Sequence, residues 1–356
     1  MQVMRESTYK IYQILKQELE NTRHPDALLP PERTLCERFN CGRSAVRTAL
    51  QQLESDGLIR SDSLRGVRQV SLRPGALHKV YVIQPDQVMF RTSPENMGVF
   101  SGISARIYAC GGEIIPVFCN YEEILTALLA NYTPHEHSGV IFLENTCHDW
   151  YHTVRQHNIP AVIANFEGDP GEAVCTRMDF RKIARRGGEE LLKRNYRRIA
   201  LIGRNSGYIN DELAAGLRGA MAEERLWFED CNIVEYLYYT KDHRLSLQAA
   251  EAMENLLNRP DRPDAFLVFR LPRVRKLLEK IRQKNLRIPS DIGIIAYDTP
   301  GWFDGIDQDI SLLEEPVEKL GSEAVDMLRQ WNINNCPPAN RVLEVDFVAS
   351  ESLRSM

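Results

Sequence analysis

The sequence has no apolar run long enough to cross a membrane, since none reaches 18 residues. Its first ten residues, MQVMRESTYK, lack the apolar core of a secretory signal. Its eight cysteines form no Cys-x-x-Cys pair and no metal-ligand spacing, and they lie scattered in apolar segments, which suits reduced thiols. These absences predict a cytoplasmic protein with no membrane partner and no structural zinc site.

Catalytic and cofactor-binding patterns are also scarce. His148 and His152 have the i, i+4 spacing of helical metal ligands, but the glutamate of the zinc-protease motif is missing between them. Residues 203–207 follow an expected strand and contain no lysine, so they do not make a phosphate-binding loop. No serine or cysteine nucleophile motif is present. We therefore predict that the protein is not an enzyme and has no catalytic residues, no metal site and no cofactor.

What the sequence does have is a local excess of positive charge. The whole chain has a net charge of −5, yet the segment from Arg33 to Arg73 holds eight arginines and only four acidic residues. A basic segment in an acidic protein is typical of a surface that contacts nucleic-acid phosphates. At 356 residues, 43% of them hydrophobic, the chain is long enough for two or three domains with a sizeable core.

The centre of the basic segment is an amphipathic helix that starts near residue 44. Val46, Ala49, Leu50 and Leu53 have the i, i+3, i+4, i+7 spacing of one apolar stripe. The opposite face carries side chains that contact phosphates or base edges in DNA complexes. They are Arg43, Ser44, Arg47, Thr48 and Gln51. The pattern predicts a helix that reads double-stranded DNA.

A shorter helix precedes this one, and two strands follow it. Pro31 suits the first turn of the shorter helix, and the tight turn 40–42 joins the two helices in a helix-turn-helix. Residues 8–20 form an earlier helix that packs behind them. The runs 58–60 and 67–70 predict two strands, with the turn 61–66 between them as a wing. Arg65 and Arg68 of this wing would face the DNA backbone or the minor groove.

The segment 29–70 resembles the GntR family of bacterial regulators. Its motifs are Leu-Pro-Pro-Glu-Arg-Thr-Leu at 29–35, Val-Arg-Thr-Ala-Leu at 46–50 and Asp-Gly-Leu-Ile at 56–59. Gly42 stands where the family usually has a capping serine, and residues 64–66 read Leu-Arg-Gly instead of Gly-x-Gly. The alternative is a small helical subdomain whose charged face is only solvated.

This resemblance implies a winged helix-turn-helix domain over residues 1–72 and a linker over residues 73–78. The DNA-contacting residues that we predict are Arg33, Arg43, Ser44, Arg47, Thr48, Gln51, Arg65 and Arg68.

From Lys79 onward, short apolar runs alternate with helical patterns. The expected strands are 80–83, 113–118, 139–143, 160–164, 198–202, 232–237, 265–269 and 292–296. The expected helices are 97–110, 121–130, 148–157, 181–194, 211–224, 245–257 and 272–284. This alternation predicts right-handed βαβ units and parallel sheets. Because so many elements exceed one comfortable sheet, we expect two α/β lobes with a ligand cleft between them.

Residues 79–356 resemble the effector domain of the LacI/GalR family, which is itself similar to periplasmic sugar-binding proteins. The motifs are Arg-Pro-Asp-Ala-Phe at 262–266, Ile-Pro-Ser-Asp-Ile-Gly-Ile-Ile-Ala-Tyr-Asp at 288–298 and Leu-Leu-Glu-Glu-Pro at 312–316. The resemblance implies a lobe one of about 79–178 and 314–335 and a lobe two of about 179–313 and 336–356. The predicted fold class is α/β, with an N-terminal winged helix-turn-helix and a two-lobed periplasmic-binding-protein-like, Rossmann-like effector domain.

The effector pocket that this resemblance implies has lost several sugar contacts. Leu213, Arg270 and Ser350 stand where the family has sugar-binding residues, whereas Asp298 matches its pocket aspartate. The residues that we expect at the effector site are Asn165, Tyr208, Arg270, Asp298 and Trp302. The gained arginine favours an acidic effector, and the alternative is a pocket that binds nothing. The aromatic residues could instead belong to the cores of the lobes.

Together these patterns predict a DNA-binding transcriptional regulator, expected to repress a catabolic operon. A homodimer would bind a pseudo-palindromic operator, with one winged helix on each half-site. A small molecule, for which a sugar or sugar derivative is one option, would close the two lobes and change the affinity for DNA. The alternative is a ligand-independent DNA-binding protein whose α/β part only dimerises. A third hypothesis is that the protein is an enzyme.

Overall fold

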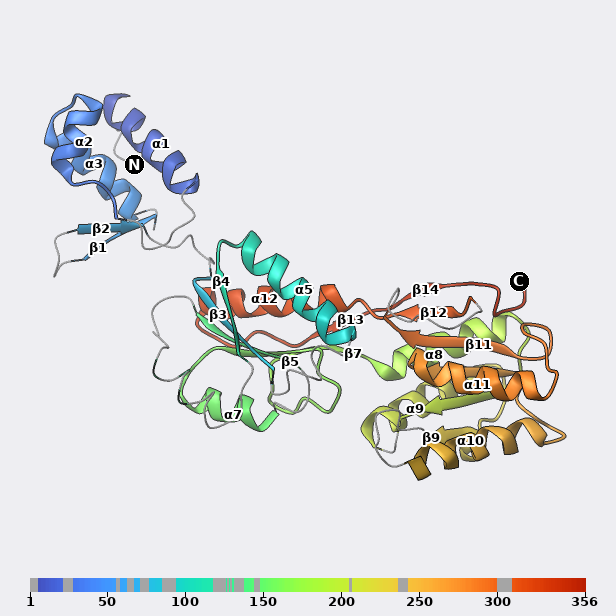
Figure 1. The fold of residues 1–356 in the computed structure, drawn as a ribbon. Helices are drawn as coiled ribbons and strands as arrows, with labels where there is room; N and C mark the ends of the chain where they lie inside the picture. The colour runs from blue at the N-terminus through green and yellow to red at the C-terminus, as the bar shows by residue number, and fades with distance from the viewer. Residues whose placement is uncertain are drawn as a thin grey trace.

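The structure is a computed structural model of the chain. It describes residues 6–21, 28–55, 58–62, 67–70, 77–84, 94–117, 126, 128, 130, 138–143, 148–204, 207–235, 243–299 and 309–356. A helical part comes first in the chain and two α/β lobes follow it (Figure 1). In the part of the chain that the structure describes, no helix is both long and apolar enough to cross a membrane.

The N-terminal part consists of three helices and a two-stranded antiparallel sheet. The elements are α1 (Glu6–Asn21), α2 (Glu32–Phe39), α3 (Arg43–Ser55), β1 (Ile59–Asp62) and β2 (Val67–Val70). The apolar stripe of α3 is buried against Leu35 of α2 and Leu15 of α1. Asn40 takes a left-handed conformation with φ of 46° and ends α2, which leaves a short turn before α3. The predicted helix-turn-helix with its following strand pair is therefore confirmed.

Lobe one is built on a parallel four-stranded sheet with the strand order β4-β3-β5-β6. Its elements are β3 (Lys79–Ile83), α5 (Pro94–Ala109), β4 (Glu113–Val117), β5 (Gly139–Leu143), α7 (His148–Gln156), β6 (Ala161–Ala164) and α12 (Val317–Asn334). Side chains alternate along β3, so Val80 and Val82 pack with α5 and α12, whereas Tyr81 and Ile83 pack with α7. The helix expected over residues 121–130 lies mostly outside the described residues.

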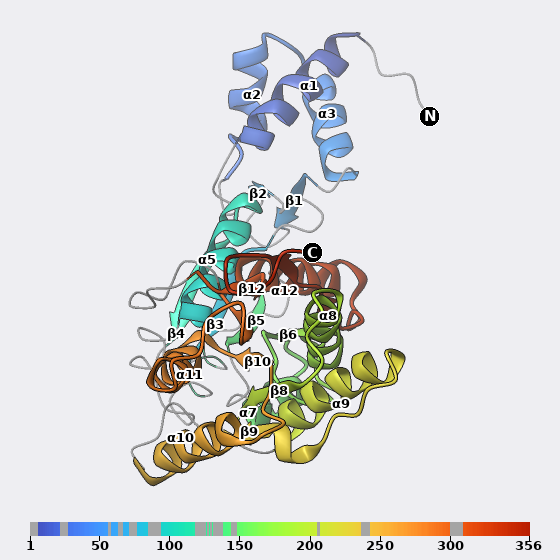
Figure 2. The ribbon, with the colours of Figure 1, turned by 90° about the vertical axis from the view of Figure 1, so that its right-hand side faces the viewer.

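Lobe two is built on a six-stranded sheet with the order β14-β12-β11-β10-β8-β9, in which only β14 is antiparallel to its neighbour. Its elements are α8 (Phe180–Lys193), β8 (Ile199–Gly203), α9 (Tyr208–Glu223), the 3-10 helix η2 (Asp230–Asn232), β9 (Ile233–Glu235), α10 (His243–Asn258), β10 (Ala265–Phe269), α11 (Leu271–Gln283), β11 (Gly293–Asp298), β12 (Ser311–Glu314) and β14 (Asp346–Val348). Helices α8 and α9 cover one face, and α10 and α11 cover the other (Figure 2). The predicted parallel sheets are confirmed.

The chain passes between the lobes three times. It crosses from β6 to α8 through β7 (Thr176–Met178), from β12 to α12, and from α12 to β14 through β13 (Arg341–Leu343). Strands β7 and β13 pair in parallel and form a separate small sheet between the lobes (Figure 1). The crossing segments bring residues from both lobes together at the carboxyl ends of β10 and β11.

Two glycines let α12 approach α5 closely. A Cβ atom on Gly102 would lie 1.9 Å from the carbonyl oxygen of Glu318, and one on Gly321 would lie 2.0 Å from that of Val99. Any side chain at either position would push the helices apart. The same packing places Val317, at the start of α12, against Gly98, one turn into α5. As a result, Glu95 of α5 and Glu315, just before α12, lie at the same end of this helix pair.

Candidate functional site

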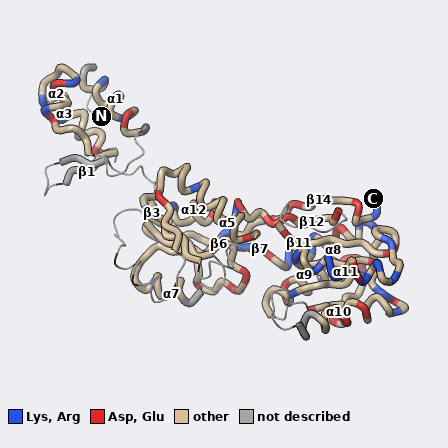
Figure 3. Tube along the Cα trace, in the orientation of Figure 1, with Lys and Arg blue, Asp and Glu red and all other residues tan. Residues whose placement is uncertain are grey.

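The predicted DNA-reading side chains share one exposed face of α3. Arg43, Ser44, Arg47, Thr48 and Gln51 are all exposed, and the apolar stripe on the opposite side of the helix is buried. Figure 3 shows basic residues along both α2 and α3. Arg33, on α2, is also exposed. The fold thus presents one basic, solvent-exposed helix face, the geometry that a major groove accepts.

Ion pairs and one hydrogen bond hold several of these side chains in the free protein. Arg47 Nε donates to Glu32 Oε2 at 2.9 Å, and Arg33 Nε donates to Glu37 Oε1 at 3.1 Å. Exposed pairs of this kind contribute little to stability, so a phosphate can replace the carboxylate at small cost. Thr48 Oγ1 donates to the carbonyl oxygen of Ser44 at 3.0 Å.

The wing is described only in part. Arg68 lies in β2 opposite Ser61 of β1, but its side chain is outside the described residues, as is all of Arg65. Contacts from the wing therefore remain predictions.

We expect Arg47→Ala to weaken operator binding by about 1–3 kcal/mol, or about 5- to 150-fold in Kd, if Arg47 reads a base edge. The measurement is fluorescence anisotropy on an operator selected from random duplex DNA, together with a repeat selection for the variant. Arg38→Ala is the matched control, because Arg38 pairs with Glu18 of α1 and is not one of the predicted DNA contacts. If Arg47→Ala keeps the wild-type affinity and sequence preference, Arg47 does not contribute to the recognition of DNA bases.

In the α/β part, several charged side chains meet at Arg270, which follows directly on β10. Its guanidinium forms ion pairs with four carboxylates. The distances are 2.9 Å to Glu167, 3.2 Å to Glu95 and 3.6 Å to Asp298, and Glu315 is also in direct contact. The side chain is only 11% exposed. We call these five residues the interlobe cluster.

The interlobe cluster connects the two lobes. Glu95 comes from the first turn of α5, and Glu167 comes from the crossing after β6, so both approach from lobe one. In lobe two, Arg270 directly follows β10 and Asp298 is the last residue of β11. Glu315 lies in the crossing between β12 and α12. A single guanidinium thus binds carboxylates from both lobes, so a change in the angle between the lobes would alter these ion-pair distances.

Burial and mutual repulsion change the acidity of the interlobe cluster. Burial raises the pKa of Glu315 to about 7, Glu95 and Glu167 add to the rise, and Arg270 opposes it. Burial also raises the pKa of Asp298. Arg270 and a hydrogen bond from the backbone N–H of Leu271 lower it in part. For Arg270, burial alone would lower the pKa, but the carboxylates outweigh it and raise the pKa well above the usual value.

The other predicted effector residues are placed differently. Asn165 follows β6 in a left-handed conformation, and its backbone N–H donates to Thr176 Oγ1 at 3.1 Å. Tyr208 starts α9, and its hydroxyl accepts from Arg177 at 3.3 Å. Trp302 lies outside the described residues. The structure therefore brings Arg270 and Asp298 into contact and gives Asn165 and Tyr208 partners outside the interlobe cluster.

Sequence reasoning missed three members of the cluster, Glu95, Glu167 and Glu315. The available signal was that Glu315 follows an expected strand-to-helix crossing, where parallel sheets bind ligands. The expectation of an acidic effector does not fit the surroundings of Arg270, because an acid would have to displace carboxylates that already bind it. At the two other lost sugar positions, Leu213 is buried in the core and Ser350 Oγ donates to the carbonyl oxygen of Asp309.

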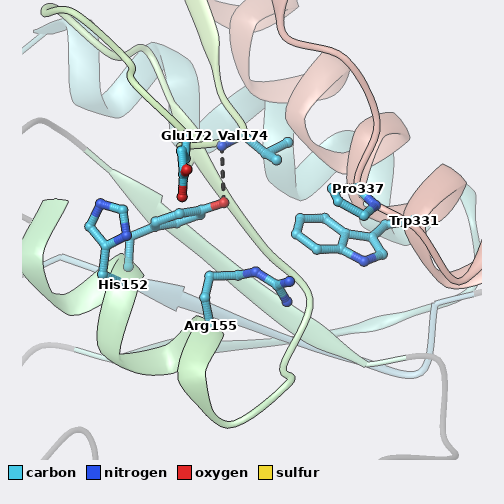
Figure 4. Close-up of a pocket in the computed structure, with 7 residues that line it drawn as sticks. His152, Arg155, Glu172, Val174, Trp331 and Pro337 are labelled. Atoms are coloured by element: carbon cyan, nitrogen blue, oxygen red, sulfur yellow. Dashed lines mark hydrogen bonds between the residues drawn. The ribbon is translucent and has the colours of Figure 1, made fainter.

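A separate cavity of about 270 Å³ lies in lobe one. Figure 4 shows Arg155 of α7 beside Trp331 of α12, with the guanidinium carbon 4.2 Å from the centre of the indole ring. The Tyr151 hydroxyl accepts from the backbone N–H of Val174 at 3.0 Å. His152 lines this cavity, whereas the side chain of His148 is not described. Among the described residues, no group of three His, Cys, Asp or Glu side chains could hold a metal ion.

The fold and the two sites define a class of protein, namely a DNA-binding regulator that carries a two-lobed α/β domain. Comparison with known families identifies both parts. Residues 8–68 match the gntR family of bacterial regulatory proteins, and residues 189–352 match the periplasmic binding protein-like domain. The chain is a transcriptional regulator that joins a gntR-family DNA-binding domain to a periplasmic binding protein-like domain.

Several known proteins are similar to this chain. The arabinose metabolism transcriptional repressor of Geobacillus stearothermophilus is 23% identical over 348 residues, which is 92% of this chain and 92% of that protein. The probable HTH-type transcriptional repressor ExuR of Bacillus subtilis (strain 168) is 23% identical over 235 residues, 64% of this chain and 69% of that protein. A LacI family transcriptional regulator from Enterococcus faecium, solved with bound ribose, has a TM-score of 0.59 at 16% identity and covers 78% of this chain and 99% of that one. This structural likeness shows the fold.

Proposed function

We propose that this regulator represses a catabolic operon and that a small molecule bound between its lobes sets its affinity for operator DNA. We further propose that it acts in the cytoplasm as a homodimer without catalytic activity, with one winged helix on each operator half-site. Residues 1–72 would form the DNA-binding domain and residues 79–356 the effector and dimerisation domain. The names of the two relatives, both of them repressors, support repression as the output.

The observation that supports control by an effector is the position of Arg270 between the two lobes. Its guanidinium binds Glu95 and Glu167 from lobe one and Glu315 from a crossing segment. Residues at the carboxyl ends of parallel strands, facing a second lobe, are where α/β proteins bind small ligands. A ligand that binds one lobe angle more tightly than another increases the population of that state. If the two states differ in their affinity for operator DNA, binding of the ligand changes operator binding.

One observation also favours the second candidate, a ligand-independent regulator. The interlobe cluster already ties the two lobes together, as a bound ligand would. In that case the α/β part would serve only for dimerisation, and no small molecule would alter operator binding.

A thermal-shift screen of the full chain against sugars, sugar phosphates, sugar acids and nucleosides separates these candidates. A specific ligand at about 100 times its Kd adds about 2.7 kcal/mol of stability, which gives an easily measured rise in Tm. Each hit is then tested for its effect on operator binding. A hit that changes the operator Kd supports effector control, whereas hits that leave the operator Kd unchanged favour the second candidate.

A further inference from the structure

We propose that Cys36 and Cys41, at the turn between α2 and α3, are a modification site, in which a hydroperoxide joins the two thiols in a disulfide that weakens operator binding. We call these two residues the turn cysteines. The inference concerns the DNA-binding part alone, so it goes beyond the proposed function and does not depend on an effector between the lobes.

The way in which α2 ends brings the turn cysteines together. Asn40 takes the left-handed conformation, and its backbone N–H donates to the carbonyl oxygen of Glu37 at 3.3 Å. The backbone N–H of Cys41 donates to the carbonyl oxygen of Cys36 at 3.1 Å. These two hydrogen bonds form a Schellman motif, in which the side chains at the positions of the turn cysteines commonly pack against each other. Because a hydrogen bond joins the two backbones, the two Cα atoms lie roughly 6 Å apart, a separation that disulfides span.

The thiols of the turn cysteines are free and half-buried, and both pack against the core of the helix-turn-helix. Burial raises the pKa of the Cys41 thiol, and Cys36 raises it further, so the two groups are close enough to interact electrostatically. A raised pKa lowers the fraction of reactive thiolate at neutral pH. The pair therefore reacts slowly and stays reduced until the oxidant is abundant.

The oxidation consumes one equivalent of hydroperoxide. One thiolate attacks an oxygen of hydrogen peroxide, the O–O bond breaks, and a sulfenic acid forms as hydroxide leaves. The second thiolate attacks the sulfenic sulfur, the S–S bond forms, the S–O bond breaks, and a second hydroxide leaves. With the two protons of the thiols, the products are one disulfide and two water molecules. The sulfur atoms lose two electrons, which the peroxide gains, and a dithiol reductant reverses the reaction.

The turn cysteines lie directly before the helix that carries the predicted DNA contacts. Only Gly42 separates Cys41 from α3, whose first residue is Arg43. Two bonded sulfur atoms lie about 2 Å apart, which is well inside the contact distance of two free thiols, so the disulfide draws the turn toward the end of α2. This movement displaces Arg43 and Arg47 relative to the DNA. Hydrogen bonds to base edges weaken steeply when their geometry changes, so operator binding falls.

Peptide mapping of the full chain detects the disulfide. Wild type is incubated with hydrogen peroxide, the remaining thiols are alkylated, and the chain is digested with trypsin. Arg38 lies between the turn cysteines, so trypsin places them in two separate peptides, 34–38 and 39–43. We expect these peptides as one disulfide-linked species that dithiothreitol separates. Recovery of the two peptides in alkylated form, or linkage of either one to another cysteine, would overturn the assigned site.

Fluorescence anisotropy on the selected operator measures the effect on DNA binding. We expect peroxide to weaken operator binding about tenfold and dithiothreitol to restore it. This recovery distinguishes the disulfide from sulfinic and sulfonic acids and from methionine sulfoxide, which dithiothreitol does not reverse. Cys36→Ser and Cys41→Ser should bind the operator when reduced and should keep that affinity in peroxide. Cys231→Ser, which removes an exposed thiol in lobe two, is the matched control and should respond to peroxide as wild type does.

Two further results would contradict the proposal. If the disulfide forms and the operator Kd does not change, oxidation of the turn cysteines does not regulate DNA binding. If both serine variants lose affinity in peroxide as wild type does, other residues cause the loss. Operator binding by the reduced variants shows that they are folded, and alanine replaces serine where a serine variant does not bind. The peptide map uses wild type, so the assignment of the disulfide does not depend on the folding of any variant.

Discussion

We expect Arg270→Ala to lower the free energy of unfolding of the α/β part by about 3–5 kcal/mol. The substitution removes the one guanidinium that contacts Glu95, Glu167, Asp298 and Glu315 together. Removing one partner of a buried ion pair is strongly destabilising, because it leaves uncompensated charge in a largely buried region. The loss should also loosen the contact between the lobes, since two of the four carboxylates come from lobe one.

Urea denaturation followed by circular dichroism at pH 8 measures this effect. Arg287→Ala, in an exposed ion pair of the same lobe, should unfold close to the wild-type midpoint. Arg270→Lys should fall between wild type and Arg270→Ala, because lysine keeps the charge but not the planar fork of donors that serves several carboxylates. A loss below about 1 kcal/mol in Arg270→Ala, the size typical of an exposed pair, would contradict the buried cluster.

The second large effect is a fall in stability as the pH rises from about 4.5 to about 7. The pKa of Glu315 is about 7 in the folded protein, against 4.5 for an ordinary glutamate. Between these values the folded state binds more protons than the unfolded state, so raising the pH favours unfolding. The part due to Glu315 amounts to about 3 kcal/mol and is complete above pH 7.

Glu315→Gln tests this assignment, because the amide imitates the protonated carboxyl and cannot ionise. We expect the variant to have a flatter stability profile between pH 5 and pH 8 and to be more stable than wild type at pH 8. Thermal unfolding across this pH range gives the comparison. Glu314→Gln, one residue earlier in β12, is the control and should keep the wild-type slope. A steep slope that persists in Glu315→Gln would assign the pH dependence to other groups.

The DNA-binding part was the most predictable from sequence. The spacing of Val46, Ala49, Leu50 and Leu53 marks a single buried stripe, and its opposite face follows from the 3.6-residue period alone. Helices α2 and α3 and the strands of the hairpin are adjacent in sequence, so local patterns were sufficient. The same reasoning identified the α/β alternation, because fully buried parallel strands such as Gly139–Leu143 appear as short apolar runs.

The interlobe cluster could be predicted only in part. Arg270 and Asp298 were identified because the resemblance to the LacI/GalR effector domain places them at its sugar-binding positions. Glu95 and Glu167 were not, because an acidic residue at the start of a helix or in a loop is usually solvated, and nothing local marks it as buried. Their meeting depends on the close packing of α5 on α12 through Gly102 and on the crossing after β6.

The sequence by itself, with the family resemblances that it carries, determined the kind of protein, a winged helix-turn-helix followed by two α/β lobes, and the residues on the exposed side of α3. These properties follow from the hydrophobic periodicity and from motifs whose residues lie close together in the sequence. The tertiary structure alone decided that Arg270 is surrounded by carboxylates and that Glu315 has a raised pKa. Burial and charge pairing depend on residues that are far apart in the chain, and only the folded packing of the lobes brings them within a few ångströms.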